Sequence, residues 1–82
     1  MSKRTRMGLL AIQEAVASAS PSAWRDAIVT AIDDGELEIS RLDGAVVRIW
    51  STASVELGEP VAIHPVAEVL AVGDRWYPAR AA

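Results

Sequence analysis

The chain has 82 residues, of which 51% are hydrophobic and 23% are charged, and its formal net charge is −3. This composition excludes a disordered tail, because disorder requires low hydrophobicity and high net charge. The absence of cysteine excludes disulfides and thiolate metal ligands. The negative charge also argues against a general nucleic-acid coat. The length predicts a single small domain.

The charges are divided unevenly along the chain. Residues 1–25 contain four basic residues and one acidic residue, which sum to +3, whereas residues 26–82 contain four arginines and ten acidic residues, which sum to −6. Lys3, Arg4 and Arg6 therefore predict a basic N-terminal arm that can contact an acidic neighbour, such as the barrel of an adjacent subunit.

Residues 4–19 predict an amphipathic helix, because strong helix formers dominate this segment and it contains no proline. Its apolar residues at spacings of three and four are Leu9, Ile12, Val16 and Ala19. This is the spacing of a coiled-coil seam, so these residues are candidate interface residues. A helix of this length must dock on something to be stable. It either covers one end of its own barrel or pairs with other chains.

From residue 27 onward the pattern predicts short strands separated by turns. The predicted strands are residues 27–32, 36–41, 45–51, 60–64 and 66–72, followed by a last strand at Trp76 and Tyr77. Closely spaced short strands favour a closed barrel, which removes exposed strand edges. The predicted fold is mainly β with an N-terminal helix: a small five- or six-stranded β-barrel, OB-like or alternatively SH3-like. Residues 1–22 form the arm and helix, and residues 23–82 form the barrel domain.

The sequence contains no recognisable catalytic or metal-binding motif. His64 is the only histidine, and the Gly-x-Ser-x-Gly elbow of serine hydrolases is absent. Asp33 and Asp34 fit a turn, and Glu36 and Glu38 share the strand face opposite the apolar residues, which places them in water and not in a catalytic pocket. We therefore expect no enzyme activity, no catalytic residue, no bound metal and no cofactor.

A possible aromatic surface consists of Trp50, Trp76 and Tyr77. Aromatic side chains beside arginines can stack on unpaired bases, which makes a single-stranded nucleic-acid-binding OB or SH3-like module the alternative function. The charge of −6 over residues 26–82 repels phosphates, so nucleic acid is not the expected partner. No segment approaches the roughly 20 apolar residues of a membrane-spanning helix, so a membrane partner is not expected either.

The small size of the domain favours oligomerisation. A domain of about 60 residues buries only about 60% of the surface that its unfolded chain exposes. Small domains therefore use disulfides, metals or partner chains for stability. With no cysteine and one histidine, a partner chain is the route that remains, and we expect a homo-oligomer.

Three segments and one tryptophan carry a resemblance to a known family. The segments read AIVTAIDDG at residues 27–35, LDGAVV at 42–47 and GEPV at 58–61, and the tryptophan is Trp76. They resemble small OB-like barrel proteins encoded among the virion structural genes of bacteriophages and prophages of actinobacteria. The resemblance implies a non-enzymatic structural part of a virion that is assembled in the host cytoplasm as rings or trimers. It also implies contacts with other virion proteins, at the tail, the head-to-tail connector or the capsid surface.

Overall fold

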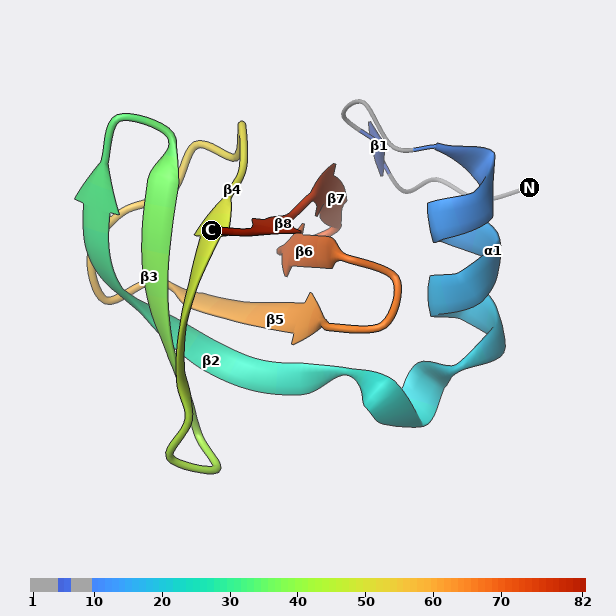
Figure 1. Cartoon of the computed structure of the whole chain (residues 1–82), viewed down its shortest axis with the longest axis horizontal. Helices are drawn as coiled ribbons and strands as arrows, with labels where there is room; N and C mark the ends of the chain where they lie inside the picture. Colours follow the sequence, from blue (N-terminus) through green and yellow to red (C-terminus); the bar gives the residue numbers. More distant parts are fainter. Residues whose placement is uncertain (1–4, 7–9) are drawn as a thin grey trace.

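The computed structural model describes residues 5–6 and 10–82, which fold into one curved sheet, one α-helix and one short 3-10 helix (Figure 1). Two short helices, α1 and the 3-10 helix η1, precede the main part of the sheet. The elements are β1 (Thr5–Arg6), α1 (Ala11–Ala19), η1 (Pro21–Ala23), β2 (Arg25–Asp33), β3 (Glu36–Arg41), β4 (Val46–Trp50), β5 (Pro60–His64), β6 (Val69–Val72), β7 (Arg75–Pro78) and β8 (Arg80–Ala81). The expected boundary between residues 22 and 23 falls within η1.

The sheet closes into a barrel through two antiparallel meanders. The strand order is β1-β7-β6-β5-β2-β3-β4-β8. The meanders β2-β3-β4 and β5-β6-β7 are joined by β2 pairing with β5 at one seam and by β8 pairing with β4 at the other. Only Ala79 separates β7 from β8, so the last stretch of chain pairs with β6 first and with β4 afterwards.

The predicted fold class, mainly β with an N-terminal helix and a small barrel, is confirmed. The strand count differs slightly, because seven strands, β2–β8, form the described barrel instead of five or six. Two predicted strands, residues 36–41 and 60–64, coincide with β3 and β5. The strand predicted at 66–72 begins only at Val69, because Pro65 is followed by a turn in which Glu68 adopts a φ of 56°.

Strict alternation of side chains places the core inside the barrel. Leu37 and Ile39 of β3 are buried, whereas Glu36 and Glu38, which alternate with them, lie on the other face. A bulge between Val29 and Ala31 lets the long strand β2 bend far enough to pair with both β3 and β5. The buried residues of this main core are Ala27, Val29, Leu37, Ile39, Ile49, Val61, Ile63, Leu70 and Ala79.

The helix is shorter than predicted, since it covers Ala11–Ala19 and not residues 4–19. Within the segment predicted as helix, Thr5 and Arg6 form strand β1, which pairs in parallel with β7. The helix starts where Gln13 can accept a hydrogen bond from the backbone N–H of Leu10 through its side-chain oxygen, at 3.0 Å. A glutamine at the third helical position is a known N-terminal signal.

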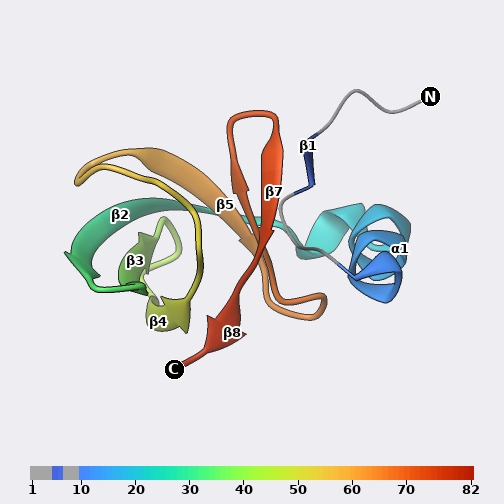
Figure 2. The same ribbon diagram turned by 90° about the horizontal axis from the view of Figure 1, so that it is seen from above.

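The helix packs against the outside of the barrel, at the end away from the β2–β3 turn (Figures 1 and 2). Ala17 of α1 joins a second buried cluster with Ala67, Val69 and Trp76, and Val16 and Trp24 pack against its edge. Of the two expected roles of the helix, the structure shows that it packs on the barrel of its own chain. No helix among the described residues is long and apolar enough to cross a membrane.

Candidate protein–protein interface

Two side chains fix the position of α1 on the barrel. The Gln13 side-chain amide donates hydrogen bonds to the carbonyl oxygens of Ala67 and Glu68, at 3.2 and 3.0 Å. One helical turn later, Ala17 is almost completely buried, and its small size lets the helix approach the barrel closely. The face of α1 that carries Gln13 and Ala17 is therefore the face that contacts the barrel.

His64 joins the end of the helix to the same part of the barrel. Its side chain is fully buried, and its ring lies 5.1 Å from the Trp24 ring in an edge-on arrangement. The backbone N–H of Ala67 donates to Nδ1 at 3.1 Å, so Nδ1 carries no proton. Nε2 therefore carries the proton and donates it to the carbonyl oxygen of Ser20 at 2.8 Å. Both ring nitrogens are used for structure.

An apolar hollow lies beside this contact, between α1 and the last strands. Leu10, Ile12 and Val66 are 63%, 67% and 70% exposed, and all three line the hollow. Its volume is about 470 Å³, and Pro78 and Arg80 form its far side. Large apolar side chains gathered around one exposed hollow mark an interaction surface more often than a scattering of single residues does.

A second hollow of about 310 Å³ continues the first across the C-terminal strands. It is lined by Trp50, which is 50% exposed, and by Pro78 and Arg80, which the two hollows share. Arg80 of β8 lies directly opposite Trp50 of β4 in the sheet register. We call the combined region the α1–Trp50 surface; its defining residues are Leu10, Ile12, Val66, Pro78, Arg80 and Trp50.

The residues predicted for the interface, from the basic arm and from the seam, fall into three groups. Lys3, Arg4 and Leu9 lie outside the described residues, and of Arg6 the structure gives only its place in β1, opposite Trp76. Val16 is half-buried at the edge of the barrel contact. Ile12 and Ala19 are exposed. The described part of the seam therefore lies beside the face that docks on the barrel and stays open to a further partner.

The predicted aromatic surface is wrong for two of its three residues. Trp76 and Tyr77 are each only 5% exposed and belong to the interior, so Trp50 alone presents an aromatic face. Sequence reasoning missed Leu10, Val66, Pro78 and Arg80. The one available signal was Pro65, which ends β5 and turns Val66 outward, because a proline cannot continue a strand ladder.

The described residues hold no cluster suited to metal binding. No group of three or more histidine or acidic side chains lies close enough together to hold an ion there. The comparisons with protein-family models, with curated proteins and with solved structures found no match.

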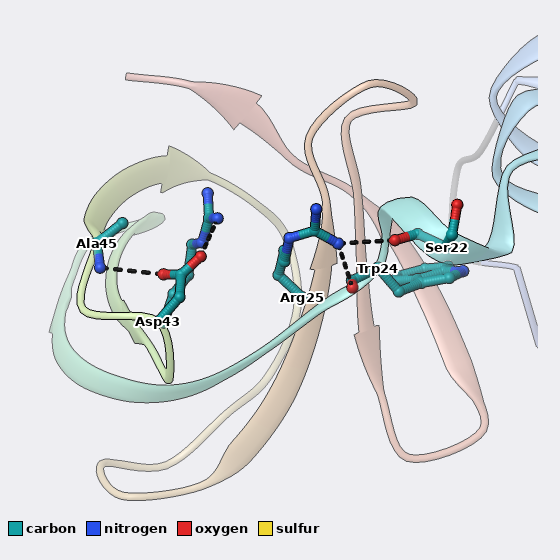
Figure 3. Close-up of polar contacts among 6 residues, drawn as sticks. Ser22, Trp24, Arg25, Asp43 and Ala45 are labelled. Atoms are coloured by element: carbon teal, nitrogen blue, oxygen red, sulfur yellow. Dashed lines mark hydrogen bonds and ion pairs between the residues drawn. The ribbon is translucent and has the colours of Figure 1, made fainter.

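Two sets of polar contacts hold the start of β2 and the turn between β3 and β4 in place (Figure 3). The Arg25 guanidinium donates to the carbonyl oxygens of Ser22 and Trp24, at 2.7 and 3.0 Å, which fixes the passage from η1 into β2. In the β3–β4 turn, Asp43 pairs with Arg41 and accepts a hydrogen bond from the backbone N–H of Ala45 at 3.1 Å. Neither contact borders the α1–Trp50 surface.

The turn contacts of Asp43 predict a small effect of pH. The hydrogen bond from Arg41, followed by that from Ala45, lowers the pKa of Asp43 below its ordinary value of 3.8. Because the pKa is lower in the folded chain, the stabilisation is complete above pH 3.8 and is lost as the pH falls through the folded-state pKa. We expect Asp43→Asn to lower the melting temperature slightly at neutral pH and not at strongly acidic pH. An equal loss at both would contradict this assignment.

Proposed function

We propose that this protein is a non-enzymatic structural component that assembles with copies of itself, of the kind found in bacteriophage virions, and that the α1–Trp50 surface is a contact between copies. The observation that carries the proposal is the exposure of Leu10, Ile12 and Val66 around a single hollow. Their burial against a neighbour would release water from apolar surface, which is the main driving force of association.

The occupant that we assign to this surface is a second copy of the chain. The first 25 residues carry +3 and the remaining 57 carry −6, so the basic arm of one copy is attracted to the acidic barrel of another. The sequence resemblance supports the narrower assignment to virion structural proteins, in which such barrels form rings or trimers. The barrel then serves as a rigid spacer, and the helix and arm make the contacts.

Replacing Ile12 with aspartate tests this contact. Residue 12 lies in the first turn of α1, where a carboxylate is favourable for the helix, so the variant should fold. Burying the new charge against a neighbour should weaken association by at least about 2 kcal/mol, which is about thirtyfold in the dissociation constant. Light scattering of the full chain over a range of concentrations measures the change.

A matched control for this experiment is Ala11→Asp. Ala11 is also exposed in the first turn of α1, but it does not line the hollow. We expect this variant to assemble like the wild-type chain. A wild-type chain that is monomeric at micromolar concentration would show that the chain does not self-assemble, and an Ile12→Asp variant of unchanged mass would show that the α1–Trp50 surface is not the contact.

One observation favours a second candidate function, single-stranded nucleic-acid binding. Trp50 is half-exposed and lies opposite Arg80, an arrangement in which a base can stack on the indole beside a cation. Titration with fluorescent oligonucleotides at low salt tests it. Saturable binding that weakens steeply with added salt, and that Trp50→Ala removes, would favour this function over self-assembly.

A further inference from the structure

The barrel has a small apolar slot at the place where its closure is incomplete. The register of β4 with β8 covers only Ile49 and Trp50, and the backbone N–H of Ala82 adds one hydrogen bond to the carbonyl oxygen of Arg48. The barrel wall therefore opens beside the first two residues of β4. The slot has a volume of about 130 Å³. The apolar side chains that line it are Val47, Ile49, Ile63, Pro65, Ala79 and Ala81. An apolar cavity of about 150 Å³ can hold a benzene molecule, so this slot has room for one aliphatic side chain.

The rim of the slot offers unused hydrogen-bond donors. It is formed by Arg41, Arg48 and Glu68. Arg41 pairs with Asp43, but its Nε is buried without a hydrogen-bond partner in the described part of the chain. Arg48 binds Glu36 through Nε, at 2.9 Å. Each guanidinium has five N–H groups, so both keep donors beyond these ion pairs and favour a carboxylate next to the slot.

The loop between β4 and β5 carries an exposed leucine with an acidic residue on either side. Leu57 is 67% exposed at the tip of this loop, with Glu56 before it and Glu59 two residues after it. Gly58, whose φ of +83° makes the turn, donates its N–H to the carbonyl oxygen of Val29 at 2.8 Å. The tip is thereby anchored on β2, and Leu57 is presented in a fixed position.

We propose that Leu57 of one copy inserts into this slot of the next copy, with the flanking carboxylates of Glu56 and Glu59 against Arg41 and Arg48. A leucine side chain has fewer carbon atoms than benzene and fits the volume. The equally exposed Leu42 is a poorer candidate, because its acidic neighbour Asp43 is ion-paired with Arg41 of the same chain. Among the described residues, in contrast, Glu59 uses only Oε1, which accepts the backbone N–H of Glu56 at 2.9 Å, and meets no cation of its own chain there.

This contact joins two different parts of the molecule. None of the residues of the Leu57 tip lines the slot of its own chain, and the loop that carries them extends away from β8 (Figure 2). A contact between unlike surfaces is heterologous, and it generates rings or open chains instead of closed two-fold dimers. The inference rests on the proposed self-assembly and adds the contact that lets the assembly grow beyond a pair.

Cysteine cross-linking of the full chain tests the contact directly, because the natural sequence has no cysteine. An equal mixture of the Leu57→Cys and Ala81→Cys single variants is oxidised mildly, and disulfide-linked dimers of mixed composition are measured by mass spectrometry. Ala81 lines the slot and is itself exposed, so both variants should fold. Because the contact holds residue 57 of one copy near residue 81 of the next, the yield of mixed dimers should be about tenfold higher than in a mixture of Leu42→Cys and Ala81→Cys. Equal yields in the two mixtures overturn the inference.

The size of the assembly separates this inference from the proposed function. If both are correct, Leu57→Asp leaves species no larger than those formed through the α1–Trp50 surface, whereas Leu42→Asp has the wild-type mass. Unchanged mass for Leu57→Asp, together with dissociation of Ile12→Asp, refutes the slot contact and leaves the proposed function standing. Cross-linking through the slot, together with an Ile12→Asp variant of wild-type mass, refutes only the α1 contact.

Discussion

Replacing Trp76 with alanine is expected to lower the free energy of unfolding by about 3–5 kcal/mol, the usual cost of removing a buried tryptophan. Trp76 is 5% exposed and forms the centre of the cluster that joins α1 to the barrel. Its ring lies 5.2 Å from that of Trp24, so the cavity would open directly beneath the helix. At about 0.05–0.15 kcal/mol per residue, this loss is a large share of the stability of a domain of this size.

Two measurements check this expectation. Chemical denaturation followed by circular dichroism gives the change in global stability, and hydrogen exchange of the α1 amides shows whether the helix is released first. Trp50→Ala is the control, since Trp50 is half-exposed and its removal leaves no internal cavity. If Trp76→Ala cost no more than Trp50→Ala, the helix would not depend on this cluster.

The strands were predictable because their signals are local. The alternation of Leu37 and Ile39 with glutamates, and the Asp-Gly turns that flank them, depend only on neighbouring residues. β8 and β1 carried no such signal, because each has two residues and owes its conformation to a partner strand far away in the sequence. Tertiary contacts, and not local preference, determine these two elements.

The candidate interface was predictable only in part, for a different reason. The spacing of Ile12, Val16 and Ala19 indicated one apolar face of the helix, but the barrel contact uses the face of Gln13 and Ala17. A polar glutamine and a small alanine are weak signals for burial. Gln13 nevertheless points inward, because the carbonyl oxygens of the 65–68 turn accept its hydrogen bonds there.

Val66 shows the second limit of sequence reasoning. An apolar residue in a β-rich segment is most simply assigned to the core. Trp76 and Tyr77 are the opposite case, since they were predicted at a surface and are buried. Which side of the sheet a residue faces depends on the strand register. The turn at Glu68 shifted that register for the segment after Pro65. The exposure of Val66 therefore follows from the pairing of the strands and not from the local sequence.

The two hydrogen bonds of the His64 ring, to Ser20 and to Ala67, predict a second large effect on stability. His64→Leu keeps most of the buried volume but leaves the backbone N–H of Ala67 without its partner. Within the described part of the chain, the carbonyl oxygen of Ser20 keeps only the hydrogen bond from the backbone N–H of Ala23, at 3.1 Å. A buried unpaired N–H costs about 1–3 kcal/mol, and the lost hydrogen bond to Ser20 adds to this cost, so we expect a marked loss of stability. Because Ser20 follows α1 directly and Ala67 lies beneath it, the loss should be greatest in the helix amides.

Two conservative variants divide this effect between its two hydrogen bonds. An asparagine at position 64 can place its side-chain oxygen near the position of Nδ1 and accept from Ala67, whereas a glutamine can reach Ser20 with its amide nitrogen. We expect His64→Asn and His64→Gln each to lose less stability than His64→Leu, and hydrogen exchange at Ala67 to be protected only with asparagine. Equal losses for all three variants would mean that the shape of the ring, and not its two hydrogen bonds, holds the helix on the barrel.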